Sequence, residues 1–166
     1  MEDLIHKTFS STEIIDRLGL EKERFRGWVD KGYITPSIKK AEGQGSRHEF
    51  NLMDLYSAAL FLHLIEDVKT TRNEAASLVK IWRNTIERDA KVVDVAYFHY
   101  IIFIRHHGEI VSVSFFPKDA FRVKETKDMI GAVVGFVRST AIESDWEDAI
   151  MINFGQLVKN IRRRIK

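Results

Sequence analysis

Two short helices joined by a three-residue turn are the feature that most constrains the fold of this chain. Ser10-Ser11-Thr12-Glu13 has the pattern of a capping box, which begins a helix. That helix ends at the glycine of Leu18-Gly19-Leu20, and a second helix is predicted from about Glu21 to Gly32. Phe25 and Trp28 recur at helical spacing and are expected in the core. Two helices this close together predict a helix-turn-helix.

A basic hairpin is predicted after the two helices, over residues 34–50. Pro36 prevents the second helix from continuing, and Gly43 and Gly45 suit the tip of a turn. The side chains that flank this tip are Lys39, Lys40, Arg47 and His48. From Arg17 to Arg47 the chain carries eight Lys and Arg against four Asp and Glu, a local charge of +4 where the whole chain has +2. Clustered positive charge suits a polyanion, although such clusters are more often a solvated face.

Two longer helices complete the first half of the chain. Asn51 is expected to cap a helix that runs to about Val68 and is apolar over much of its circumference. Thr71 is expected to cap another helix, through Arg88, with a single apolar stripe. The first domain is therefore predicted over residues 1–88, mostly helical with one hairpin.

A β-hairpin is predicted after Asp89, where the composition changes. Residues 92–104 and 110–116 are rich in aromatic and β-branched side chains, and His106-His107-Gly108-Glu109 between them suits a turn. The aromatic side chains of these strands are candidates for the pocket of an effector. The core of a small sheet, or a dimer interface, is the favoured interpretation.

Three further elements are predicted toward the end of the chain. These are a helix from about Glu125, a buried strand over residues 149–153 and a basic amphipathic helix from about Phe154. Together with the hairpin they predict a small α/β domain over residues 89–166. The fold class of the whole chain is therefore predicted as α+β.

Several classes of function lack support in the sequence. The chain has no cysteine, which excludes disulfides and thiolate sites. His106 and His107 are expected to be solvated in a turn and His99 has no carboxylate at ligand spacing, so no metal or cofactor is predicted. It contains no Gly-x-Ser-x-Gly, phosphate loop or His-Glu-x-x-His motif, so it is predicted not to be an enzyme. No apolar run is long enough to cross a membrane and no secretion signal is evident, so a cytoplasmic, nucleoid-associated location is expected.

Three segments of the first half occur in an order and at a spacing typical of one protein family. They are Phe25–Pro36, with its Phe-Arg-Gly-Trp start and Gly-Tyr-Ile-Thr-Pro end, then Glu42–Leu55, which is glycine-rich and contains an arginine, and Lys69–Leu78. Together they resemble the N-terminal winged helix-turn-helix of the MerR family of bacterial transcription regulators. Gly27 and Val29 depart from the family pattern, in which an aromatic residue and an acid are usual. The heptads of the family's dimerisation helix are also absent after the last predicted helix of this half.

The resemblance implies that the second helix and the hairpin, or wing, bind double-stranded DNA. The expected DNA-binding residues are Lys22, Glu23, Arg24, Arg26, Lys39, Lys40, Arg47 and His48. The start of the second helix would lie nearest the base edges, where Arg24 would bond guanine and Glu23 would accept from cytosine. Arg26 and the hairpin cations would contact phosphates and set register and bulk affinity.

The resulting hypothesis is a transcriptional regulator that acts as a homodimer on a pseudo-palindromic operator. The second domain would dimerise and respond to any small-molecule effector, whose chemistry is left open. One alternative keeps DNA binding but makes the chain an architectural or recombination accessory protein. Another is a protein-interaction adaptor that has kept the fold and lost the DNA contacts, which Gly27 keeps open.

Overall fold

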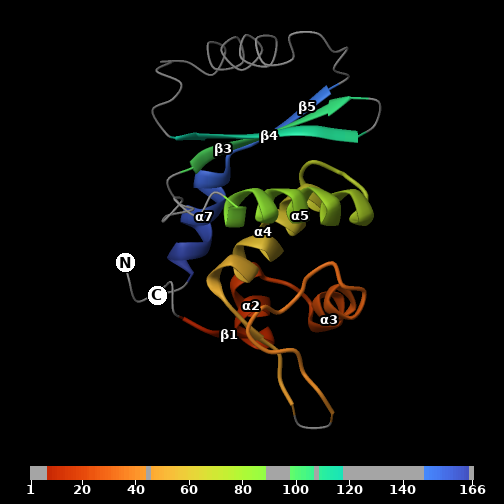
Figure 1. Cartoon of the computed structure of the whole chain (residues 1–166). Coiled ribbons are helices and arrows are strands. Elements are labelled where there is room, and N and C mark those ends of the chain that lie inside the picture. The colour runs from red at the N-terminus through yellow and green to blue at the C-terminus, as the bar shows by residue number, and fades with distance from the viewer. Residues whose placement is uncertain (1–6, 44–45, 89–97, 107–108, 118–147, 165–166) are drawn as a thin grey trace. The chain divides into compact units, whose positions relative to one another are not determined.

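The structure is a computed structural model, drawn as a coloured ribbon in Figure 1, that describes residues 7–43, 46–88, 98–106, 109–117 and 148–164. By its internal contacts the chain divides into a first unit, residues 1–83 with 157–166, and a second unit, residues 84–156. The first boundary between the units, after residue 83, lies close to the predicted boundary after residue 88. A second boundary, after residue 156, was not predicted, because residues 157–166 belong to the first unit.

Helix α2 (Ser11–Leu18) begins at the predicted capping box. The Glu13 backbone amide donates to the Ser10 hydroxyl at 3.3 Å, and the Ser10 amide donates to the Glu13 carboxylate at 2.8 Å. Gly19 then adopts a left-handed φ of 66° and ends the helix. Both ends of this helix are confirmed as predicted.

Helix α3 (Lys22–Asp30) lies within the predicted second helix and presents its aromatic residues to the core. Phe25 and Trp28 are both buried. The Phe25 ring centroid lies 5.8 Å from that of Phe50, and the Trp28 ring meets Phe61 edge-on at 4.9 Å. These contacts hold α3 against Phe50 of the hairpin and Phe61 of the helix that follows it, which confirms the predicted core role of both residues.

The predicted hairpin is present, and its two arms pair at Lys39 and Glu49. Lys39 and Glu49 exchange two backbone hydrogen bonds, at 3.2 and 2.9 Å. Strand β2 (Glu49–Phe50) pairs on its other side with β1 (Phe9–Ser10) in an antiparallel register that places Phe9 opposite Phe50. The β1 pairing was not predicted, and it joins the returning arm of the hairpin to the start of α2.

Helices α4 (Leu52–Glu66) and α5 (Arg72–Arg88) begin at the predicted caps. The Asp54 amide donates to the Asn51 side chain at 2.8 Å, and the Glu74 amide donates to the Thr71 hydroxyl at 3.3 Å. Most of α4 is buried around its whole circumference, as its all-round apolar sequence predicts. This helix is therefore the centre of the first unit's core.

The second unit contains a three-stranded antiparallel sheet. Strand β3 (Phe98–His106) lies between β4 (Glu109–Pro117) and β5 (Asp148–Ile152). Residues 101–104 of the central strand are buried on both faces, including the aromatic Phe103. The predicted hairpin and the last strand are confirmed where the structure describes them.

Two predictions for the second unit need comment. His106 and Glu109, the two ends of the predicted turn, pair with each other as the last residue of β3 and the first residue of β4. Residues 92–97 of the predicted first strand and the helix predicted from about Glu125 lie outside the described residues.

Helix α7 (Phe154–Arg163) returns the chain to the first unit. Its Val158 and Ile161 are buried, and Arg17 and Arg164 exchange side-chain to carbonyl hydrogen bonds at 2.9 and 2.7 Å. The predicted amphipathic helix is confirmed, but its placement in a domain of residues 89–166 differs from the structure. An apolar stripe shows that a helix has a buried face, and it does not show which unit covers that face.

Helices and small antiparallel sheets occur together, which confirms the α+β class. Among the helices of the described residues, none combines the length and the apolar character needed to cross a membrane.

The capping box predicts a specific dependence of stability on pH. The backbone hydrogen bond from Ser10 lowers the pKa of Glu13 below its ordinary value of 4.5, helped by the Ser10 hydroxyl and the nearby Arg17 and Lys7. A lowered folded-state pKa stabilises the fold above the unfolded pKa, and this contribution is lost as the pH falls below 4.5. Glu13→Gln is therefore expected to destabilise the first unit at pH 7 by less than about 1 kcal/mol, because the side chain is partly exposed. Urea unfolding should show this difference shrinking toward pH 3; a difference that is constant with pH would contradict the assignment.

Candidate functional site

The outer face of α3 carries the polar residues that the sequence analysis singled out. Lys22, Glu23 and Arg26 are exposed, whereas Phe25 and Trp28 on the opposite face are buried. One face therefore anchors the helix while the other is free to meet a partner. The helix begins at Lys22, and the side chain of its N-cap residue Glu21 accepts no hydrogen bond from the first amide groups of the helix.

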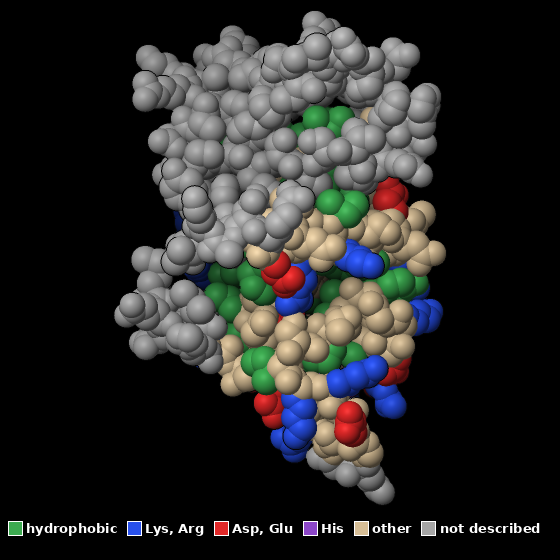
Figure 2. All heavy atoms as spheres, viewed as in Figure 1, with side chains coloured by type: hydrophobic (Ala, Val, Ile, Leu, Met, Phe, Trp, Pro, Cys, Tyr) green, Lys and Arg blue, Asp and Glu red, His purple; other side chains and the backbone are tan. Residues whose placement is uncertain are grey.

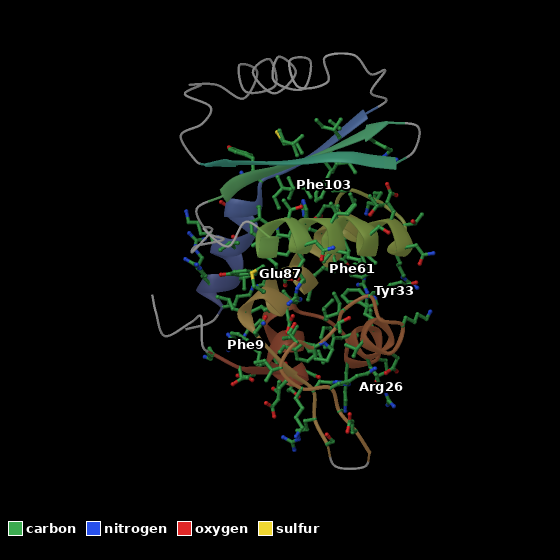
Figure 3. All side chains as sticks on the ribbon, in the orientation of Figure 1. Phe9, Arg26, Tyr33, Phe61, Glu87 and Phe103 are labelled. Atoms are coloured by element: carbon green, nitrogen blue, oxygen red, sulfur yellow. The ribbon has the colours of Figure 1, made fainter. Side chains whose placement is uncertain are left out.

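Arg26 is the more accessible of the two arginines of α3. Its side chain is 79% exposed, and Figure 3 shows it pointing away from the body of the first unit. Its Nε lies 3.6 Å from a carboxylate oxygen of Asp30, one helical turn further on. An exposed pair at this distance contributes little and opens readily, so the guanidinium is available to a stronger anion.

Arg24 has a different environment from the one expected. Its Nη1 donates to Glu66 at 2.5 Å, and its guanidinium carbon lies 5.0 Å from the centre of the Trp28 ring. The guanidinium is thus held against α4 and a buried aromatic residue. The guanine contact expected of Arg24 would require this ion pair to open.

The hairpin presents three cations to solvent. Lys39, Lys40 and Arg47 are exposed, and within the described part of the chain none of them has an ion-pair partner. Their backbone is fixed by the pairing between Lys39 and Glu49. The hairpin therefore carries three positive charges that no carboxylate of the described residues neutralises.

His48 makes contacts within the hairpin. Its Nδ1 accepts a hydrogen bond from the Ala41 amide at 3.0 Å, and its ring lies 6.1 Å from that of Phe50. The accepting nitrogen carries no proton, so the ring hydrogen is on Nε2 in this arrangement. His48 thus ties the two arms together through Nδ1, and its expected DNA contact stays a prediction.

A buried carboxylate anchors the first arm of the hairpin. Asp54 is fully buried, and its oxygens accept from the Ser37 amide at 2.9 Å, the Ser37 hydroxyl at 2.6 Å and the Asn51 amide at 2.9 Å. Arg83 Nη1 completes the set at 2.6 Å, and its Nη2 donates to the Ser37 hydroxyl at 2.7 Å. The loop before the hairpin, the start of α4 and the middle of α5 are therefore joined through one charged group.

A second contact joins the loop after α3 to α5. The Tyr33 hydroxyl donates to the Asn73 side chain at 3.0 Å, and the Tyr33 ring stacks on Phe61 at 5.6 Å (Figure 3). Together with the Asp54 network, it fixes both ends of the segment between α3 and the hairpin.

The resulting surface is basic but mixed. Figure 2 shows Lys and Arg side chains around the hairpin end of the first unit, with a few Asp and Glu between them. Residues 39–48 carry three Lys and Arg against one Glu, a local charge of +2. Across the described residues, no three His, Asp or Glu gather where they would hold a metal ion. The chemistry available here is the binding of an anion by exposed cations.

Comparison with protein-family models and with curated proteins finds no match for this chain. Sequence reasoning identified the exposed cations, but it missed the Glu66 partner of Arg24 and the Arg83 partner of Asp54. Each partner lies 29 or more positions away along the chain, so no local pattern signals it.

Proposed function

We propose that the first unit binds double-stranded DNA as a winged helix-turn-helix of the MerR type. The observation that carries the proposal is the pairing of an exposed polar face on α3 with an anchored hairpin whose three cations lack partners among the described residues. Exposed Lys and Arg on rigid supports are what phosphate binding requires.

In this proposal α3 enters the major groove and the hairpin follows the phosphates. Lys22 and Glu23, at the exposed start of the helix, face the base edges, where Glu23 accepts from cytosine. Arg26, Lys39 and Lys40 contact phosphates, as does Arg47 on the other arm. Arg24 supports the helix from behind through Glu66 and Trp28.

We further propose that the chain acts as a homodimeric transcriptional regulator. A single small reading helix gives modest specificity, and a two-fold operator doubles the contacts. The second unit is the proposed dimerisation region. A chain that stays monomeric at micromolar concentration, both with and without DNA, would contradict this part of the proposal.

Arg26→Ala tests the role of α3. It is expected to weaken binding to duplex DNA about five- to tenfold and to reduce the slope of log affinity against log salt by about 0.9, because one phosphate contact is lost. Fluorescence anisotropy with a labelled duplex measures both quantities.

Lys80→Ala is the matched control, since Lys80 is an exposed cation on α5. Its affinity and salt slope are expected to equal those of the wild-type chain. Equal effects of the two substitutions would show only a general loss of charge and would contradict the placement of Arg26 at the interface.

A further inference from the structure

We propose that a pocket in the first unit, separate from the α3 and hairpin surface, binds a small organic acid. The pocket lies among α2, α4 and α7 and has a volume of about 180 Å³. A cavity of roughly 150 Å³ is known to hold benzene, so this pocket has room for one small ring or a short branched chain. A bound acid would place its carboxylate near Arg164 and its apolar body among the leucines.

The apolar part of the lining comes from all three helices. Leu18 closes the α2 side, Leu62 belongs to α4, and Leu157 and Ile161 belong to α7. Leu62 and Leu157 are only partly buried in the empty pocket, so covering them with a ligand removes further apolar surface from water. This lining favours a ligand with a hydrocarbon body over a free inorganic ion.

The polar part of the lining includes one guanidinium with donors that remain open, that of Arg164. The Arg17 guanidinium is engaged, because its Nη1 donates to the Arg164 carbonyl at 2.9 Å and its Nη2 lies 3.8 Å from the Glu13 carboxylate. Arg164 uses Nη1 for the Arg17 carbonyl, and its side chain is exposed, with no carboxylate paired to it in the described ranges. The remaining donors of the Arg164 guanidinium are therefore open to an acceptor on a ligand.

Both carboxylates that line the pocket already have hydrogen-bond partners, and this favours a negatively charged ligand. Glu66 is bonded to Arg24, and Asp67 lies 2.5 Å from Nδ1 of His63. A carboxylate only accepts, so Nδ1 carries the hydrogen of that contact. With both acids engaged and the Arg164 guanidinium without a paired carboxylate among the described residues, the pocket favours an anion over a cation.

Sodium benzoate is the probe that fits this volume and chemistry. Titrated into the full chain, it is expected to shift the NMR methyl signals of Leu62, Leu157 and Ile161 with one dissociation constant, on the order of 1 mM for so small a ligand. Benzamide, which has the same shape without the charge, is expected to bind about tenfold more weakly. Absence of these shifts up to roughly ten times that concentration, or equal binding of benzamide, would overturn the proposal.

Arg164→Ala is expected to weaken benzoate binding about tenfold, because a charged hydrogen-bond donor is lost. Arg163→Ala is the matched control, since Arg163 is also exposed near the end of α7 but does not line the pocket. Equal effects of the two substitutions would place benzoate elsewhere and overturn the proposal. The titration contains no DNA, so its outcome is independent of the proposed DNA binding.

Discussion

Asp54→Ala is expected to lower the free energy of unfolding of the first unit by about 3–5 kcal/mol. The substitution removes the acceptor of four hydrogen bonds and leaves the Arg83 guanidinium without its buried carboxylate. Because Asp54 is fully buried, the Ser37 and Asn51 amides lose an acceptor that water cannot readily replace, and the ion pair with Arg83 is lost as well. Urea unfolding followed by tryptophan fluorescence measures the loss. Asp54→Asn, which keeps the shape and part of the hydrogen bonding, is expected to cost less.

Asp16→Ala provides the control for this prediction. Asp16 is exposed on α2, and such surface substitutions usually change stability by less than about 0.5 kcal/mol. A loss below about 1 kcal/mol for Asp54→Ala would contradict the central role of this carboxylate, since even an ordinary hydrogen bond contributes that much.

Replacing Lys39, Lys40 and Arg47 together with alanine is expected to reduce DNA affinity by roughly 100-fold at low salt, taking about 1 kcal/mol for each exposed ionic contact. The slope of log affinity against log salt should fall in magnitude by about 2.7, since each lost phosphate contact removes about 0.9. The three side chains are exposed and support no packing, so the fold should remain intact. Anisotropy titrations at several salt concentrations give both values, and circular dichroism checks the fold.

A matched triple variant separates the hairpin from net charge. Lys80, Lys159 and Arg163 are likewise two lysines and one arginine, all exposed, on α5 and α7. Replacing them with alanine removes the same charge and is expected to leave the salt slope unchanged. A drop in slope equal to that of the hairpin variant would mean that the hairpin has no special part in binding.

Local patterns predicted the elements of the first unit well. Both capping boxes depend on residues three positions apart, Ser10 with Glu13 and Asn51 with Asp54, so the sequence displays them directly. The aromatic spacing of α3 likewise identified its buried face. These features need only the periodicity of a helix and the chemistry of its ends.

The contacts between distant segments were the ones that could not be predicted. Arg24 looks like a free cation in the sequence, and its partner Glu66 comes from another helix. The β1 strand has two residues, too few for a periodic signal. The return of α7 to the first unit depends on which surface covers Ile161. A hydrophobic stripe in the sequence does not indicate which surface that is.

The candidate site shows the same division. The exposed positions of Arg26, Lys39 and Lys40 agree with their predicted place on the surface. His48 stands in the same basic stretch of sequence, but the free amide of Ala41 across the hairpin engages it. Composition identifies charged stretches, and only the fold shows which of their side chains already have partners.

Selection of genomic fragments by the purified full chain tests the central claim, sequence-specific binding of duplex DNA, most directly. The account predicts enriched fragments that share a two-fold motif, with half-sites spaced by about 10 base pairs or a multiple of that spacing. Enrichment should be lost with the Lys39, Lys40 and Arg47 triple variant and retained with the Lys80, Lys159 and Arg163 variant. Recovery of no shared motif above the unselected pool would contradict the account.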